Sequence, residues 1–329
     1  MKRSRFVGWF KSTLRVLAAT TVCALPAWAE PLKIGYSDWP GFVAWQIGIE
    51  KGWFKEAGVD VQFEWFDYAA SLDAFTAGKL DAVGLTNGDA LVIGSSGGKG
   101  SMILINDYSN GNDMVIAKPG LKSIKDLKGK KVGVEIGFVD HLLLLNALEK
   151  NGMKESDVTL VNSPTNELPQ VLASGDVDAI SVWQPNSNVA LKLLPGSKSV
   201  YNSADEPGLI YDGLSVSPAS LAARRADWIK VLRVWYRIVG YVYDPATHAD
   251  AVKIMAARVG LKPQEYEPLV GGTKILTLEQ AKQAYIKAEG FKSIYGSSKI
   301  VDQFNVKYDV YKQSQPVDTY LDASLTKGL

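Results

Sequence analysis

A stretch of this chain nearly repeats itself further along, and this repeat constrains the fold more than any other feature. Residues Ala77–Val83 read AGKLDAV and residues Ser174–Ile180 read SGDVDAI, an offset of 97 residues. Upstream, Lys33–Gly35 is echoed by Lys131–Gly133 at an offset of 98 residues. Two such units, each strand–helix–strand–helix–strand, predict two similar α/β lobes. A crevice then lies between them, at the carboxyl ends of the strands, where small ligands bind.

The first 29 residues have the pattern of a secretory signal. Five basic residues precede or flank a short apolar stretch at Val16–Pro26, and Ala27-Trp28-Ala29 is a typical cleavage site. The apolar stretch is too short to span a bilayer, although a membrane anchor or a buried helix is the alternative. We therefore expect residues 1–29 to be a signal peptide and the remainder to be exported to the periplasm.

The charge and cysteine content of the mature part exclude some functions. Without residues 1–29 the basic count falls from 36 to 31 against 35 acidic residues, so the net charge is −4. This balance argues against nucleic acid as a partner. The single cysteine, Cys23, leaves with the signal, so the exported chain needs no disulfide.

The order of the predicted elements indicates two crossings between the lobes. Expected strands lie at Leu32–Tyr36, Val59–Phe66, Leu80–Leu85, Met102–Tyr108, Met114–Ala117, Lys131–Glu135, Val158–Val161, Val177–Val182 and Leu209–Ser217. The segment after residue 218 is mostly helical. We place the crossings near residues 116–120 and 211–215. Lobe 1 then comprises residues 30–117 and 213–329, and lobe 2 residues 118–212, joined by a hinge that closes around a ligand.

Several motifs resemble those of one protein family. They are KGWFKEAGVDV at residues 51–61, SIKDLKGKKVG at 123–133, WQP at 183–185 and the two repeated stretches. In this order they resemble the nitrate/taurine-type (NMT1-like) periplasmic solute-binding proteins of ABC transporters. The resemblance implies an α/β, two-lobe periplasmic binding protein fold of type II, with the ligand in the inter-lobe cleft. It also implies a monomer without cofactor, which hands a small-molecule solute to a membrane permease and its ATPase.

Residues that follow strand ends are the candidates for ligand contact, because carboxyl ends of parallel strands face the crevice. They are Ser37, Asp38, Trp39, Asp67, Tyr68, Asn87, Asp89, Asp107, Glu135, Phe138, His141, Trp183 and Asp212. The set is rich in carboxylates and aromatic rings. No Arg occurs between residues 30 and 212, so a bidentate fork for a sulfonate or carboxylate is missing from these loops.

This composition favours a small planar cation, with guanidinium as the sharpest candidate. Asp38 or Asp89 from one lobe and Glu135 from the other would accept its N–H donors. Trp39 and Trp183 would cover its two faces through cation–π contact. A taurine, sulfonate or nitrate receptor that uses backbone N–H groups is the alternative. A binding protein or enzyme for a pyrimidine or thiamine precursor is a second alternative.

Several of these residues also have a structural interpretation. Asp38 and Asp89 are as well suited to capping the helices that follow them. Asp140 complements a helix dipole, His141 is more typical of a hydrogen-bonded structural histidine, and Trp183 also fits a core position. Asp81 and Asp178 recur at strand starts, and Trp228 and Trp235 lie one heptad apart on a helix. We expect all four to be structural.

An enzymatic function has little support in the sequence. No G-x-S-x-G or H-E-x-x-H motif is present, the mature part lacks cysteine, and His141 and His248 fall in different predicted lobes. We therefore expect a receptor and not an enzyme.

Overall fold

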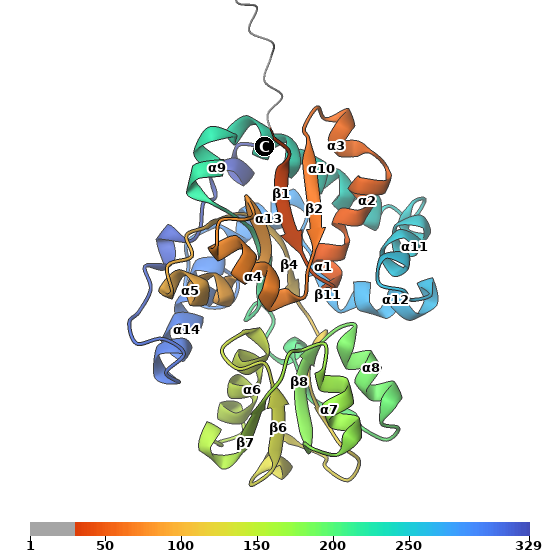
Figure 1. Ribbon diagram of the computed structural model, residues 1–329, viewed down its shortest axis with the longest axis vertical. Coiled ribbons are helices and arrows are strands. Elements are labelled where there is room, and N and C mark those ends of the chain that lie inside the picture. The colour runs from red at the N-terminus through yellow and green to blue at the C-terminus, as the bar shows by residue number, and fades with distance from the viewer. Residues whose placement is uncertain (1–29) are drawn as a thin grey trace, which may run out of the picture. The chain divides into compact units, whose positions relative to one another are not determined.

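Two β-sheets organise the chain, one in each lobe (Figure 1). The computed structural model describes residues 30–329, and the expected signal peptide lies outside the described residues. Residues 31–329 form one unit. The first sheet has the order β11 (Thr273–Ile275), β4 (Ser101–Ser109), β10 (Tyr211–Val216), β3 (Ala82–Thr86), β1 (Leu32–Tyr36), β2 (Val61–Trp65). The second has the order β7 (Thr159–Asn162), β6 (Lys131–Val134), β8 (Ala179–Trp183), β5 (Asp113–Ala117), β9 (Lys198–Asn202).

Helices cover both faces of each sheet, as the alternation of strands and helices requires. Those of lobe 1 are α1 (Pro40–Val43), α2 (Trp45–Glu50), α3 (Trp53–Glu56), α4 (Tyr68–Thr76), α5 (Asn87–Ser95), α9 (Pro218–Ala223), α10 (Arg225–Tyr243), α11 (His248–Arg258), α12 (Pro263–Gly271), α13 (Leu278–Ala284), α14 (Ile294–Lys307) and α15 (Ser324–Lys327). Those of lobe 2 are α6 (Val139–Lys150), α7 (Leu168–Ser174) and α8 (Asn186–Leu193). Within residues 30–329 no helix has the length and apolarity needed to cross a bilayer.

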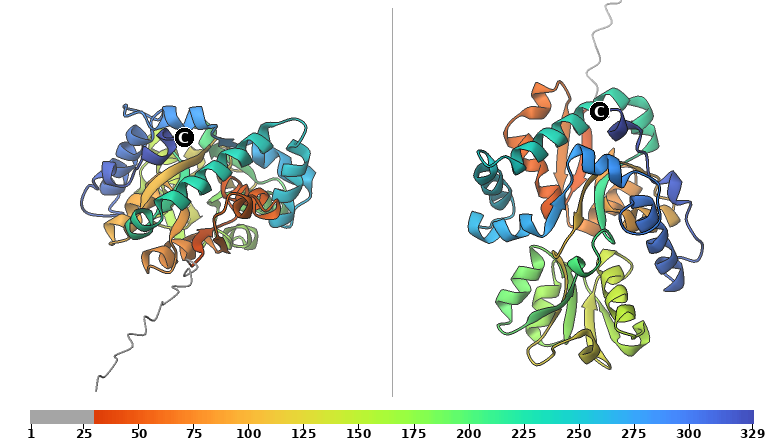
Figure 2. Two further views of the ribbon diagram at one scale, coloured as in Figure 1. Left: turned by 90° about the horizontal axis from the view of Figure 1, so that it is seen from above. Right: turned by 180° about the vertical axis from the view of Figure 1, so that it is seen from behind.

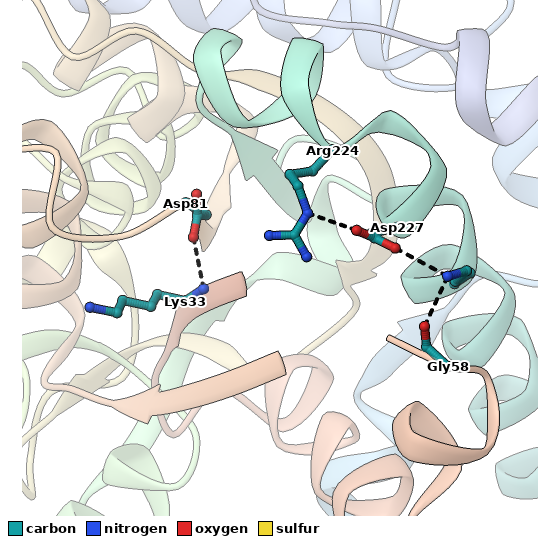
Figure 3. A network of polar contacts seen from close by, with 6 residues as sticks. Lys33, Gly58, Asp81, Arg224 and Asp227 are labelled. Carbon is teal, nitrogen blue, oxygen red and sulfur yellow. Dashed lines mark hydrogen bonds and ion pairs between the residues drawn. The ribbon is translucent and has the colours of Figure 1, made fainter. Parts of the chain in front are cut away.

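The sequence repeat corresponds to a structural repeat. In lobe 1 the backbone N–H of Lys33 donates to the carboxylate of Asp81 at 2.9 Å (Figure 3). In lobe 2 the N–H of Lys131 donates to Asp178 at 3.0 Å. Each aspartate thus fixes the start of the third parallel strand beside the first, which confirms the structural role expected for both. Figure 3 also shows Asp227 pairing with Arg224 at the start of the long helix α10.

The two lobes share one strand arrangement, and this arrangement decides where the ligand site lies. Strands β1, β2 and β3 are parallel, as are β6, β7 and β8. In each sheet the next strand, β10 or β5, is antiparallel to the third parallel strand. The amino-terminal end of this antiparallel strand therefore meets the carboxyl ends of its neighbours, at the edge that faces the other lobe.

The crossings between the sheets differ from the predicted positions by several residues. Strand β5 at Asp113–Ala117 pairs with β8 and β9 of the second sheet, although we expected residues up to 117 in lobe 1. The first crossing is therefore at residues 110–112, and the second lies between β9 and β10, at residues 203–210. The two connections run side by side (Figure 2), and a 2.6 Å hydrogen bond joins the hydroxyls of Ser109 and Ser203.

Hydrophobic packing fixes the sheet of lobe 1 on both faces. Leu32 and Ile34 point to the face covered by α2 and α10, where Trp45 and Trp235 pack with ring centroids 4.5 Å apart. Val83 of strand β3 points to the opposite face of the sheet. Trp228 and Trp235 are fully buried, which confirms their predicted packing role.

Candidate ligand-binding site between the lobes

A small cavity of about 10 Å³, room for about one water molecule, lies between the lobes. We call it the inner cavity. It is lined by Trp39, Phe42, Tyr68, Thr86, Asp113, Val139, Trp183, Ile210 and Asp212. Apolar rings and aliphatic groups form most of this wall, and the two aspartates are its ionisable carboxyl groups. None of the lining residues is Lys or Arg.

The two carboxyl groups occupy equivalent positions in the two lobes. Asp212 lies on β10 opposite Thr86, the last residue of β3. Asp113 lies on β5 opposite Trp183, the last residue of β8. The internal repeat therefore presents one carboxyl group from each sheet to the inner cavity. Oδ2 of each accepts no hydrogen bond from a donor group among residues 30–329, and a protonated Asp212 donates to the neighbouring carboxylate of Asp107.

The surroundings of these carboxyl groups make their ionisation costly. Burial raises the pKa of Asp113 to about 7, against a weaker opposing hydrogen bond with Ser109. Burial, followed by the negative charges of Asp107 and Asp113, raises the pKa of Asp212 well above its ordinary value. Because these like charges lie close together and no lining Lys or Arg offsets them, the protonated forms of the carboxyl groups are favoured.

Two further aspartates stand behind the wall and hold its aromatic rings. The indole N–H of Trp39 donates to Asp107 at 3.0 Å, and the hydroxyl of Tyr68 donates to Asp89 at 2.6 Å. Burial is the largest cause that raises the pKa of Asp107 and of Asp89 to about 7. Gly41 allows this packing, because a Cβ there would stand 1.8 Å from Oδ2 of Asp107.

A second cavity of about 260 Å³ borders the first, and we call it the outer cleft. Its lining residues are Asp38, Trp65, Phe66, Asp67, Tyr68, Ala69, Ala70, Glu135, Pro164, Thr165, Asn166, Trp183 and Asn186. Asp38 connects the lobes there, since it accepts hydrogen bonds from the indole N–H of Trp183 at 3.2 Å and from Asn186 at 3.0 Å. Burial raises the pKa of Asp38 against these two hydrogen bonds.

One hydroxyl connects the outer cleft to a buried carboxyl group. Oγ1 of Thr165 lies 2.9 Å from Glu135 and 3.0 Å from Asp140. A threonine hydroxyl donates only one hydrogen, so both contacts are hydrogen bonds only when one carboxyl group is protonated. Burial raises the pKa of both acids, and that of Asp140 well above its ordinary value.

The structure separates the sequence-predicted site residues into two groups. Seven line a cavity: Asp38, Trp39, Asp67, Tyr68, Glu135, Trp183 and Asp212. Six line neither: Ser37, Asn87, Asp89, Asp107, Phe138 and His141. Asp89 and Asp107 support the rings described above, and the Phe138 and Tyr68 ring centroids are 6.5 Å apart. Buried Ser37 directly follows strand β1.

Asn87 and His141 are occupied by structural contacts. Asn87 donates to the hydroxyls of Ser297 and Ser298, both at 3.1 Å, and so fixes α5 against α14. Nδ1 of His141 accepts from the N–H of Gly137 at 3.3 Å. These partners explain why neither side chain points into a cavity, although both follow a strand end.

Asp113 is the carboxyl-bearing residue of the inner cavity that the sequence reasoning missed, and the uncharged lining residues Phe42, Thr86, Val139 and Ile210 were not predicted either. Asp113 begins a strand, whereas the search considered residues that end strands. Because β5 runs antiparallel to β8, its first residue lies at the same sheet edge as the last residue of β8. The Ser109-Asn110-Gly111-Asn112 turn just before it was the available signal, since such residues typically mark a chain reversal.

Comparison with known proteins agrees with this architecture. A family model described as NMT1/THI5 like matches residues 39–229. The chain belongs to the NMT1/THI5-like family. The resemblance expected from the sequence motifs is therefore confirmed.

Among described residues, no group of three or more His, Cys, Asp or Glu is arranged to hold a metal ion.

The sequence matches to individual relatives cover only about half of each protein. A protein of Brucella abortus (strain 2308) is 34% identical over 177 residues, 53% of this chain and 54% of that protein. The taurine-binding periplasmic protein of Escherichia coli (strain K12) is 26% identical over 176 residues, 53% of this chain and 51% of that protein. The chain thus spans about half the length of these relatives.

The fold itself extends over nearly the whole chain. The alkanesulfonate-binding protein SsuA from Xanthomonas axonopodis pv. citri, solved with bound MOPS, superposes with a TM-score of 0.74 at 17% identity. The superposition covers 89% of this chain and 98% of that chain. The expected two-lobe fold of type II periplasmic binding proteins is confirmed.

Proposed function

We propose that this protein is the periplasmic substrate-binding subunit of an ABC importer and that it captures a small solute between its lobes. The family, the two-lobe fold and the names of the relatives support this role. The connections at residues 110–112 and 203–210 provide the hinge, and the inner cavity marks where the solute binds between the lobes. Delivery to a membrane permease with its ATPase follows from this role, and the solute leaves the protein chemically unchanged.

The ligand that we propose is a small planar cation, with guanidinium as the best fit. The observation that carries this proposal is the pair Asp113 and Asp212, one carboxyl group from each sheet, buried together without a lining cation. Guanidinium presents N–H donors along its edges, so Oδ2 of each carboxylate would accept from it. The Trp39 and Trp183 rings border the same cavity and would add cation–π contact of about 0.5–2 kcal/mol.

The carboxyl pair differs from the one proposed on the sequence. We expected Asp38 or Asp89 opposite Glu135, but Asp38 and Glu135 border the outer cleft and Asp89 stands behind Tyr68. In the structure, Asp113 and Asp212 supply the negative charges that a cation would compensate. A neutral analogue of the same shape, such as urea, would leave those charges uncompensated.

A sulfonate receptor is the second candidate, because two relatives are named for taurine and alkanesulfonate binding. The inner cavity fits such an anion poorly. No Lys or Arg lines either cavity, and an anion would add a further negative charge beside Asp113 and Asp212. An anion would be accommodated only with both aspartates protonated, and its binding would strengthen at low pH.

Calorimetry with guanidinium, urea and taurine, side by side at pH 8, tests the proposal. We expect heat from guanidinium at one-to-one stoichiometry and no measurable heat from the other two. Replacement of Asp113 by Asn should weaken guanidinium at least a hundredfold. The matched control is Asp318→Asn, which removes an equal charge from an exposed ion pair with Lys287 and should leave affinity unchanged. Heat from taurine alone would refute the cation proposal.

A second variant tests the outer cleft separately. Glu135→Gln removes a partly buried carboxylate that lies near the proposed ligand chamber but does not line it. It should weaken guanidinium several-fold through loss of a neighbouring negative charge, and spare or strengthen any anion. An unchanged guanidinium affinity would show that the outer carboxylates do not contribute.

A further inference from the structure

Tyr68 and Trp183 stand between the two cavities, and this position has a consequence for ligand choice. Both residues line the inner cavity and the outer cleft. Tyr68 begins helix α4 of lobe 1, and Trp183 ends strand β8 of lobe 2. Their rings meet edge to face, with centroids 5.3 Å apart and planes at 72°. Each lobe thus contributes one half of the wall between the cavities.

The two rings leave no gap between them that a substituent could use. A centroid distance of 5.3 Å in a T-shaped pair is ring-to-ring contact, so a methylene chain does not fit between the two rings. Both rings are also held from behind. The Tyr68 hydroxyl donates to Asp89 and accepts from the N–H of Thr86 at 3.1 Å, while the Trp183 indole donates to Asp38.

We propose that Tyr68 and Trp183 form a partition that restricts the ligand to an unsubstituted planar cation, by closing the inner cavity to any ligand that carries a chain. This inference rests on the proposed cation-binding function and adds its size limit. The inner cavity, at about 10 Å³, leaves no space for a substituent beside the head group. An N-alkyl substituent would have to extend into the outer cleft, through the space that the two rings fill.

Removal of the partition should change the class of ligand. Without the indole ring, the inner cavity and the outer cleft would become continuous, and a chain on the cation would have room. The outer cleft adds its own preference, because Asp67 and Glu135 line it. A chain that ends in an ammonium group would meet these carboxylates, whereas a plain alkyl chain would not.

The experiment compares three ligands: guanidinium, butylguanidine and (4-aminobutyl)guanidine, titrated by calorimetry into the full protein. The wild type should bind guanidinium at least a hundredfold more tightly than either substituted ligand. Trp183→Ala should reduce this ratio to less than ten, with the aminobutyl compound preferred over the butyl compound. Trp183→Phe keeps a ring but loses the hydrogen bond to Asp38, so it should retain most of the size limit. Ratios are compared because Trp183→Ala also weakens guanidinium itself.

The outcomes separate the partition from the proposed function. Absence of guanidinium binding to the wild type would refute the cation-binding function. Strong guanidinium binding with butylguanidine within tenfold would instead refute the partition alone, as would an unchanged ratio in Trp183→Ala. Tyr68→Val provides a second opening of the same wall if Trp183→Ala does not fold, and it should lower the ratio in the same direction.

Discussion

Replacing Asp113 by Asn should stabilise the protein without ligand while it abolishes cation binding. Asp113 is only 2% exposed, and one of its carboxylate oxygens has no hydrogen-bond partner among the described residues. Its charge also raises the pKa of Asp212, Asp107 and Asp140. An uncharged amide of nearly the same shape removes the cost of this charge and eases the ionisation of its neighbours.

The size of the effect follows from the pKa of Asp113 in the two states. Burial raises this pKa to about 7 from the ordinary 3.8 of an unfolded chain. Between these values the folded state binds more protons than the unfolded state, so the stability of the wild type falls as pH rises. The ionisation then costs the fold about 4 kcal/mol at pH 8 and about 2 kcal/mol at pH 5. The variant avoids this cost, so its gain should be larger at pH 8.

Urea denaturation of the ligand-free protein at pH 8 and pH 5 measures these differences. The matched control is Asp302→Asn. Asp302 is also buried, but it accepts hydrogen bonds from the Tyr311 hydroxyl at 2.9 Å, the N–H of Gln315 at 2.8 Å and the Ser314 hydroxyl. This control should lose about 1–3 kcal/mol, because an amide cannot satisfy all three donors. A loss of stability in Asp113→Asn at pH 8, or a gain that is equal at both pH values, would refute the reasoning.

Three further predictions concern the binding site. Guanidinium affinity should fall by up to about a hundredfold per pH unit below about pH 7, because two lining carboxyl groups, Asp113 with a pKa of about 7 and Asp212 with a raised pKa, must each lose a proton to bind a cation. Calorimetry in buffers of different ionisation enthalpy should detect the released protons, and an affinity independent of pH would contradict this. Gly41→Ala should weaken guanidinium at least tenfold by displacing Asp107, whereas Gly240→Ala, where a Cβ meets nothing within 4 Å, should not change the Kd in the same titration. Asp38→Asn should speed guanidinium release several-fold in stopped-flow fluorescence, since an amide offers a single acceptor oxygen to Trp183 and Asn186; an unchanged rate would exclude Asp38 as a contact that holds the lobes together.

The repeat predicted the lobes well because it reflects backbone contacts that every such unit needs. The Lys33–Asp81 and Lys131–Asp178 contacts sit at the same place in the two sheets. Aspartate at a strand start is a local signal, so the sequence alone identified it. Hydrophobic alternation and glycine-bounded helices likewise depend on near neighbours in the chain.

The crossing points were harder to predict because strand partners are not local. Residues 114–117 are apolar and fit either sheet, and the Lys118-Pro119-Gly120 turn resembles a linker. The actual crossing lies at residues 110–112, where Gly111 has a φ of 117° that favours glycine. Pairing of β5 with β8 and β9 decides this, and no local pattern encodes it.

The acidic and aromatic lining of the cavities was predicted, but only some of its residues were. The proposal of a cation came from these residue types and from the absence of Arg between residues 30 and 212, and it stays a prediction. The search missed Asp113 because it assumed that lining residues end parallel strands. It included His141 because that residue follows a strand, whereas its helix turns the ring toward Gly137.

Asp113 and Asp212 lie on the strands that directly follow the two connections between the sheets. Any rotation of one half of the molecule against the other must therefore shift the two charged groups relative to each other. The distance between them therefore changes with the angle between the halves, and under the proposed function a solute that contacts both carboxyl groups would fix that angle. Ligand recognition and lobe closure would thus depend on the same short connections. A mutation that alters ligand specificity should therefore also alter the angle through which the lobes rotate.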